Sequence, residues 1–406
     1  MPLSDTDTPP RQEMDDPLSD MEDEFEELYE EDLEMVDDGN NGAIEDNDEG
    51  MGSDGDSSEF IPERDDAAVV FSNHTEPVFC GNFNKAATLA VTGSQDDKAF
   101  IWDTSNGNVI SELKNHKDSV VAAEFNYDDT LLATADLGGT IQVWNVTSSE
   151  LIWSEKIEEF RWMKWHSASS VLLCATPHEG TYFWKLPEGI CKVLPHHDPA
   201  VANDCGLLMP DGLRAAQGYS DGTLKVFDLK ACAAIASFTA DSAANCLTAH
   251  PDNNLVAVGY ANGQVMLYKT NPAKLVTEFN EERTDNLPYA ESIRFSPDAN
   301  LPYLVVGFLT GCINVWDLSK QTLRHRLNAT YGVVQLCWDK HTLNIFGGLC
   351  DGSVIAIDPR DGTKKAQLLG HKNNILDMTL STDGSKVLTT SEDKTARIFH
   401  IQSLQN

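Results

Sequence analysis

The sequence predicts an all-β fold in which eight small four-stranded sheets close into a ring, preceded by a disordered acidic tail. Three observations predict it. A short strand-like segment ending in a bulky residue recurs at a nearly constant interval along the 406-residue chain. Short apolar segments separated by Gly, Asn and Asp turns fill each interval, and they show no helical period. The first 66 residues differ sharply in composition from the remainder.

The acidic segment comes first. Residues 1–66 contain 27 Asp and Glu residues against only Arg11 and Arg64, a net charge of −25 out of the total of −36. Such a segment cannot bury enough apolar surface to offset the entropy lost on ordering, so we expect it to be disordered. Residues 25–36 have apolar spacing that would suit an amphipathic helix on a partner, although a simple polyanion explains the same composition. The serines beside acidic residues are candidate kinase sites: Ser4, Ser19, Ser53, Ser57 and Ser58.

The apolar segment 67–71 follows the tail and belongs to no repeat of its own. We expect it to form the outer strand of the sheet that ends at Phe399. Pairing the first strand with the last sheet closes the ring and removes exposed strand edges, which would otherwise invite aggregation.

The repeated units occupy residues 67–401, and residues 402–406 form a short C-terminal tail. The bulky marker residues stand at positions 102, 144, 184, 227, 268, 316, 357 and 399, which gives steps of 42, 40, 43, 41, 48, 41 and 42 residues. A body of this size is too large for one compact core, but repeat architectures escape that limit because each unit packs only on its neighbours. We therefore predict eight blades, with seven as the alternative if the degenerate third unit is not a blade.

A period of about 40–45 residues closing on Trp-Asp, as in Trp102-Asp103, resembles the WD40 repeat and implies a β-propeller of four-stranded blades. In that family a hydrogen-bond chain runs from a His before the first strand, through a turn Asp, to the Trp. The residues that match are His74, Asp96 and Trp102 in the first unit, His371 and Asp393 in the last, Asp221 and Asp351 in the fourth and seventh, and Trp144, Trp184 and Trp316 at the Trp position.

Four units depart from this pattern. The second has His116 and Trp144 but Gly138 at the Asp position. The third, fifth and sixth have His178, Asn262 and Thr310 there. We expect these four blades to lack the buried charge-assisted link and to depend more on packing. On this reading the repeat His and Asp residues are structural.

Several sequence segments that differ from blade to blade resemble the angio-associated migratory cell protein family, and their order and spacing agree along essentially the whole chain. These segments are residues 93–102, 115–120, 161–166, 322–325 and 333–338. That family is similar in turn to a dedicated chaperone that escorts a newly made, basic large-subunit ribosomal protein. The likeness to the chaperone depends on the acidic tail and the eight blades.

This resemblance implies a basic protein partner. A strongly acidic chain neutralises Lys and Arg of such a client and speeds their encounter. The same charge argues against direct binding to nucleic acid, because phosphate is repelled. Acidic side chains on the loops that enter the inner strands, and on the turns between second and third strands, are the candidate binding residues: Glu76, Asp97, Asp118, Glu158, Glu159, Asp198, Glu291 and Glu392.

Nothing in the sequence indicates catalysis or a cofactor. None of the common nucleotide-binding, zinc-protease or serine-hydrolase motifs occurs. His196-His197-Asp198 is a weak metal signal, so we expect no metal site. The nine scattered cysteines are expected to be reduced and buried within strands.

The remaining expectations concern location and rival functions. The N-terminus has no apolar signal segment, and no run approaches the roughly 20 apolar residues that span a bilayer. We expect a cytoplasmic monomer, with the nucleus as a second compartment. Two rival functions remain open: a scaffold in signalling and cell migration, and escort of another basic client such as histones.

Overall fold

The computed structural model describes residues 60–280, 289–298 and 300–401. The expectations for residues 1–59, including the helix at 25–36 and the candidate serines, lie outside the described residues, as does the tail at 402–406.

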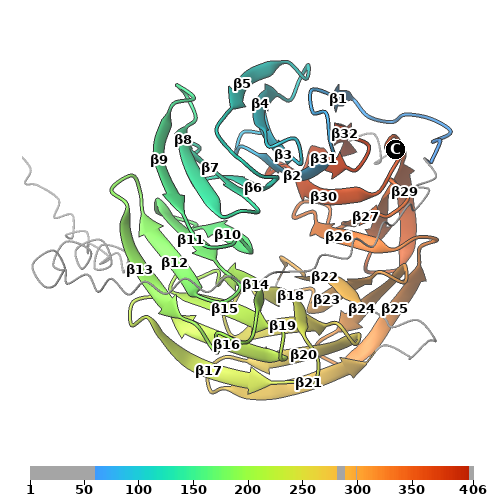
Figure 1. Ribbon diagram of the computed structural model, residues 1–406. Helices are drawn as coiled ribbons and strands as arrows, with labels where there is room; N and C mark the ends of the chain where they lie inside the picture. Colours follow the sequence, from blue (N-terminus) through green and yellow to red (C-terminus); the bar gives the residue numbers. More distant parts are fainter. Residues whose placement is uncertain (1–59, 281–288, 299, 402–406) are drawn as a thin grey trace, which may run out of the picture. The chain divides into compact units, whose positions relative to one another are not determined.

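Eight four-stranded antiparallel sheets make up the described part of the chain, and they follow one another around a central axis (Figure 1). The third unit forms a complete sheet, so the prediction of eight blades is confirmed and the seven-bladed alternative is excluded. Within each of the first seven blades the strands pair in chain order, from an inner strand near the axis to an outer strand at the periphery, whereas the outer strand of blade 8 is β1.

The first four blades have the following strands. Blade 1 comprises β2 (Val78–Phe83), β3 (Leu89–Ser94), β4 (Ala99–Asp103) and β5 (Val109–Leu113). Blade 2 comprises β6 (Val120–Phe125), β7 (Leu131–Asp136), β8 (Thr140–Asn145) and β9 (Leu151–Lys156). Blade 3 comprises β10 (Trp162–Trp165), β11 (Val171–Ala175), β12 (Gly180–Lys185) and β13 (Ile190–Pro195). Blade 4 comprises β14 (Asn203–Leu208), β15 (Arg214–Tyr219), β16 (Thr223–Asp228) and β17 (Ala233–Thr239).

The other four complete the ring. Blade 5 comprises β18 (Ala244–Ala249), β19 (Leu255–Tyr260), β20 (Gln264–Lys269) and β21 (Lys274–Asn280). Blade 6 comprises β22 (Ala290–Phe295), β23 (Tyr303–Phe308), β24 (Cys312–Asp317) and β25 (Thr322–Asn328). Blade 7 comprises β26 (Val333–Trp338), β27 (Ile345–Leu349), β28 (Val354–Asp358) and β29 (Thr363–Leu368). Blade 8 comprises β30 (Ile375–Leu380), β31 (Lys386–Ser391), β32 (Ala396–His400) and β1 (Val69–Phe71).

The middle strands of several blades are nearly continuous apolar sequences because both faces of these strands are buried. All six residues of β7 and of β23 are buried, because both faces of each blade pack on the neighbouring blades. One core cluster, for example, joins Ile141 and Val143 of blade 2 to Met163 and Leu172 of blade 3. The core is therefore a series of layers between blades rather than a single centre.

The predicted closure of the ring is confirmed. Strand β1 pairs antiparallel with β32, with Val69 opposite Ile398 and Phe71 opposite Ala396. Phe71 is buried and stacks on Trp102 of blade 1, with ring centroids 4.8 Å apart. The N-terminal strand thus joins the last blade to the first.

Residues 60–66 also contact the propeller, although their composition resembles that of the acidic tail. The Phe60 N–H donates to the Lys372 carbonyl at 2.7 Å, and the Asp66 N–H donates to the Leu369 carbonyl at 2.8 Å. Asp65 forms an ion pair with Arg397, whose side chain is buried in β32. Because the acids of this stretch have specific partners, it is attached to blade 8.

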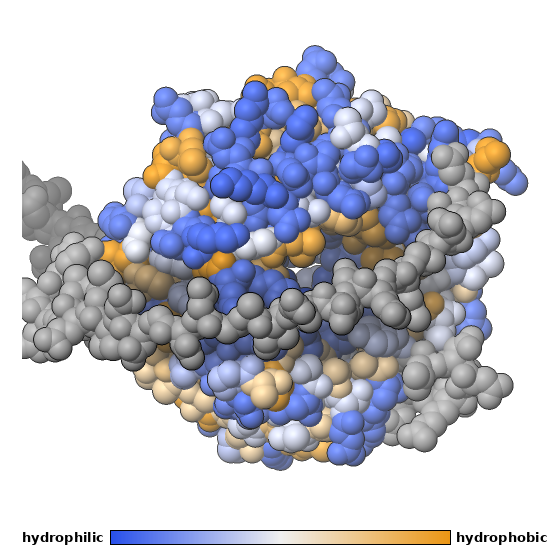
Figure 2. Space-filling view, in the orientation of Figure 1, coloured by the Kyte–Doolittle hydropathy of each residue, from blue (hydrophilic) through white to orange (hydrophobic). Residues whose placement is uncertain are grey.

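The antiparallel order places two sets of loops at the same end of every blade. We call this end the upper rim: it comprises the loops from each outer strand to the next inner strand, such as 72–77, and the turns between second and third strands, such as 95–98. The face drawn in Figure 2 shows mostly hydrophilic side chains, with hydrophobic ones in separate small patches. A polar surface of this kind suits recognition by charge and hydrogen bonding.

Candidate binding site on the upper rim

Three blades contain a histidine–aspartate link, although it was predicted only for blades 1 and 8, and each adds a threonine that the sequence pattern did not suggest. In blade 1, His74 Nδ1 lies 3.1 Å from Asp96 Oδ2 and its Nε2 lies 3.0 Å from Thr92 Oγ1. In blade 8, His371 contacts Asp393 at 2.9 Å and Thr389 at 2.8 Å. Both imidazoles are fully buried and directed into the blade.

The expectation for blade 2 is wrong. Gly138 occupies the usual turn position, but Asp136 at the end of β7 provides the carboxylate instead, with Oδ2 3.1 Å from His116 Nδ1. Thr134 then links His116 Nε2, at 2.8 Å, to Trp144 Nε1, at 3.0 Å. Asp136 can serve because it also accepts the Thr140 N–H at 2.7 Å, which folds its carboxylate back over the turn. Blade 2 therefore has the complete series of hydrogen bonds from Asp136 through His116 and Thr134 to Trp144.

Two other matches are weaker than the pattern implied. Trp102 Nε1 is buried with no hydrogen-bond partner among the described residues, so the chain in blade 1 ends at Thr92. Asp221 of blade 4 lies 3.1 Å from His197, but both side chains are partly exposed. His197 is thus used in this contact, and His196 contacts the Pro177 carbonyl at 2.9 Å.

Most of the acidic residues predicted for binding lie on the upper rim. Glu76, Asp97, Asp118, Glu158, Glu159 and Asp198 are exposed on its loops and turns, and Glu392 is partly exposed on the β31–β32 turn. Glu76 is 3.2 Å from Lys394 and so is already paired. Glu291 was expected on a loop but lies in inner strand β22, at a bulge between Ala290 and Ser292. Burial raises the pKa of Glu291, although Asn245 donates a hydrogen bond to it.

The most distinctive feature of the rim is a hollow between blades 2 and 3. Its volume is about 620 Å³. Three carboxylates face it: Glu155 from the end of β9, Glu158 from the following loop, and Glu179 from the β11–β12 turn. Of these, only Glu158 was predicted from the sequence.

Aromatic rings form the floor of this acidic hollow. Tyr182 and Trp184 are stacked, with centroids 5.5 Å apart and planes at 10°. The Tyr182 hydroxyl donates to Glu179 Oε2 at 3.0 Å, which fixes that carboxylate at the edge of the rings. Carboxylates around a partly exposed aromatic face are suited to a Lys or Arg side chain, through ion pairing and cation–π attraction.

The electrostatics of the hollow are those of an uncompensated acidic site. Desolvation, the hydrogen bond to Glu179 and the nearby carboxylates raise the pKa of Tyr182 to about 12. Desolvation and Glu155 raise the pKa of the Cys191 thiol to about 11. The one cation of the lining, Lys156, donates to the Gly138 carbonyl and lies 3.5 Å from Thr140 Oγ1, so it is directed toward blade 2.

The central channel is a weaker candidate for a basic segment because its lining holds more cations than free carboxylates. A cavity of about 470 Å³ is lined by the inner strands. Within it Lys164 is paired with Glu124. Asp377 accepts the N–H groups of Gly81, at 3.1 Å, and Met378, at 2.8 Å. Arg161 and Arg294 also line this cavity, so it offers no excess of acid to a cationic ligand.

Other classes of site find no support in the part of the chain that the structure describes. Within those residues, no group of three or more His, Cys, Asp or Glu side chains is placed to hold a metal. No helix of the described residues is long and apolar enough to cross a membrane. The nine cysteines are free thiols, but the expectation that all are buried is wrong, since Cys191 is exposed beside the acidic hollow.

Comparisons with known proteins agree with this architecture. The model of the WD domain, G-beta repeat family matches residues 233–269 and 362–400, and that of eukaryotic translation initiation factor eIF2A matches residues 62–181. The ribosome assembly protein SQT1 of Saccharomyces cerevisiae is 21% identical over 89% of this chain and 92% of its own. The crystal structure of Chaetomium thermophilum Sqt1, bound to the N-terminus of ribosomal protein L10, superposes with a TM-score of 0.74 at 20% identity, covering 83% of this chain and all of that one.

A higher identity is found with the human angio-associated migratory cell protein. It is 36% identical over 354 residues, which cover 83% of this chain and 81% of the human protein. The dog protein of the same name gives the same identity over the same length. Together with the eight blades, this similarity shows that the chain belongs to the angio-associated migratory cell protein family.

Proposed function

We propose that this protein is a non-catalytic binding platform that escorts a newly made, basic large-subunit ribosomal protein during ribosome assembly. The observation that carries the proposal is the hollow between blades 2 and 3, where Glu155, Glu158 and Glu179 surround Tyr182. This arrangement fits a Lys or Arg side chain of an extended basic segment. It offers a binding surface, and the one thiol of its lining, Cys191, stays protonated at neutral pH because its pKa is raised to about 11.

Charge supports the same conclusion. The chain carries −36, most of it in residues 1–66. A ribosomal protein that has not yet met its RNA is rich in uncompensated Lys and Arg, so an acidic partner shields it and accelerates the encounter. Nucleic acid is the unfavoured ligand, because its phosphates are repelled by the same field.

The relatives add independent support. One is named for ribosome assembly, and a solved relative with the same fold is bound to the N-terminus of a ribosomal protein. Translation takes place in the cytoplasm, so escort of a new ribosomal protein places this chain there, with the nucleus as a further site of assembly. We propose that it acts as a monomer and without a cofactor.

Capture from translating extracts tests the proposal. Affinity-purified full-length protein should enrich one basic large-subunit ribosomal protein together with the ribosomes still making it. The triple variant Glu155→Gln, Glu158→Gln, Glu179→Gln should lose this enrichment. Enrichment of histones, or of no basic protein, would contradict the ribosomal client.

The second candidate function is a scaffold in cell migration, which the name of the 36%-identical relatives favours. A scaffold would bind its partner independently of translation. Treating cells with puromycin, which releases nascent chains, separates the two functions: ribosomal-protein capture should fall, whereas a scaffold complex should persist.

A further inference from the structure

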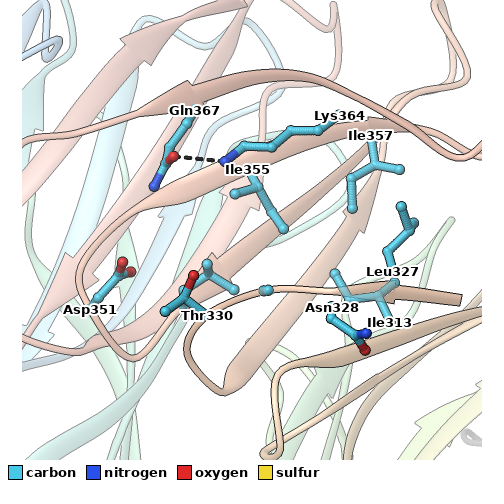
Figure 3. Close-up of a pocket in the computed structure, with 11 residues that line it drawn as sticks. Ile313, Leu327, Asn328, Thr330, Asp351, Ile355, Ile357, Lys364 and Gln367 are labelled. Atoms are coloured by element: carbon cyan, nitrogen blue, oxygen red, sulfur yellow. Dashed lines mark hydrogen bonds between the residues drawn. The ribbon is translucent and has the colours of Figure 1, made fainter.

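A small cavity lined by both apolar and polar side chains lies between blades 6 and 7, on the upper rim. Its volume is about 140 Å³. In Figure 3, Ile355 and Ile357 of β28 lie across the space from Ile313 and Leu327 of blade 6, with Asp351 and Thr330 at one end. A cavity of roughly 150 Å³ in a protein core is large enough for one benzene-sized ring.

The cavity lies where other blades of this chain place an imidazole. Ala329 stands 22 residues before Asp351, the separation between His74 and Asp96 and between His371 and Asp393. Gly347 takes the place of Thr92, and Ile357 takes the place of Trp102. All three differences replace a larger side chain by a smaller one, so they open the space.

Blade 5 shows how the space is filled when the histidine is absent. Ala240 stands 22 residues before Asn262, but Tyr260 and Tyr268 are buried beside it and their hydroxyls lie 3.0 Å apart. In blade 7 the residue that corresponds to Tyr260 is Leu349, which is smaller. The missing ring of blade 7 is therefore not replaced from within the described residues of the chain.

The acceptor for the missing ring remains in place. Asp351 Oδ1 accepts the Ser353 N–H at 3.0 Å and its hydroxyl at 2.7 Å, as a turn aspartate should. In blade 1 the other carboxylate oxygen of Asp96 lies 3.1 Å from the histidine and 2.9 Å from the Thr75 nitrogen. Among the described residues, no imidazole and no Thr330 N–H takes these roles at Asp351.

The charged residues of the lining, Asp351 and Lys364, offset one another, so the cavity has no excess of acid to favour a cation. Lys364 lines the cavity and donates to Gln367 at 2.7 Å, as the dashed line in Figure 3 shows. A second cation would meet like charge here, whereas a neutral ring with one N–H donor satisfies both the apolar walls and Asp351. The cavity thus differs from the acidic hollow between blades 2 and 3, which occupies the equivalent position and suits a cation.

We propose that the cavity between blades 6 and 7 binds a neutral, imidazole-sized ring with an N–H donor, supplied by a histidine of the basic protein segment bound at the upper rim. The source of the ring rests on the proposed function, but the site itself does not. Filled in this way, the cavity selects among basic clients by one side chain, which charge alone cannot do.

Free 4-methylimidazole is the probe for the site. At about pH 8.5, where the ring is mostly neutral, it should shift the methyl NMR signals of Ile355, Ile357 and Leu327 saturably. Ala329→His should weaken this binding by about tenfold or more, because its own ring fills the space. Ile357→Trp, which fills the cavity from the opposite wall, should do the same. The matched control Ala240→His should leave the binding unchanged, provided the variant remains folded by circular dichroism.

A peptide pair identifies the source of the ring. Wild-type protein should prefer a Lys/Arg-rich peptide with one histidine over the same peptide with alanine by about tenfold, and Ala329→His should abolish the preference but not the binding. If the free probe causes no saturable shifts, or if its binding is insensitive to both filling variants, the cavity does not bind a ring. If the free probe binds but the histidine peptide is not preferred, the ring does not come from a histidine of the client. Failure of both peptides to bind would count against the rim as a basic-peptide site, while the free probe would still decide the cavity.

Discussion

His116 Nδ1 of blade 2 lies 3.1 Å from Oδ2 of Asp136, a residue at the end of β7 rather than in the following turn. The carboxylate is fully buried, and so is the imidazole. Removing the carboxylate should leave the buried imidazole without its hydrogen-bond partner. We expect Asp136→Ala to lower the free energy of unfolding by about 3–5 kcal/mol, as breaking a buried pair does. Urea unfolding measures the change.

The same links predict an acid-sensitive stability. Burial opposes ionisation, but hydrogen bonds from His371, Thr395 and the Lys372 N–H hold the pKa of Asp393 below its ordinary value of 3.8. A depressed folded-state pKa contributes stability that is present above 3.8 and lost as pH falls through the folded value. Unfolding free energies measured from about pH 5 to 2 should therefore fall steeply. Asp393→Asn should be less stable at pH 5 and show a shallower decline. An unchanged slope would contradict this role for Asp393.

Ring closure depends on Phe71, which stacks on Trp102 while its strand pairs with β32. Phe71→Ala should destabilise the protein by about 3–5 kcal/mol, the usual cost of emptying a large aromatic site. Val70→Ala, at an exposed position of the same strand, is the control and should have little effect. Equal losses for the two variants would show that strand pairing, and not this ring, holds the blades together.

Asp65 should matter although it lies within the acidic segment. It neutralises Arg397, whose side chain is only 8% exposed. Asp65→Asn should lower stability by about 1–2 kcal/mol, since the buried guanidinium loses its counter-charge while solvent already screens the half-exposed Asp65. Deleting residues 1–59, in contrast, should leave the Tm nearly unchanged. A large drop on that deletion would show that the omitted acids support the fold.

The blade count and the closing strand could be predicted because both appear as local patterns. The marker residues recur once per blade, and segment 67–71 has no repeat of its own. The blade 2 link could not, because Asp136 and Gly138 differ by two positions and only the turn geometry shows which side chain reaches His116. The acidic hollow could not be predicted either, since Glu155 and Glu179 are 24 residues apart and meet only when blades 2 and 3 pack together. Loop position in the sequence points to Glu158 but not to Glu155, which lies in strand β9.

The central claim is that the hollow of Glu155, Glu158 and Glu179 binds a basic protein segment. Titration calorimetry with an Arg-rich peptide, at low and at physiological salt, tests it most directly. The triple variant Glu155→Gln, Glu158→Gln, Glu179→Gln should weaken binding by about tenfold to a hundredfold and flatten its salt dependence. The control Glu63→Gln, Glu150→Gln, Glu188→Gln changes the net charge equally at residues outside the hollow and should retain most of the affinity. Equal loss in both variants would mean that overall charge, not this site, attracts the peptide, and would contradict the account.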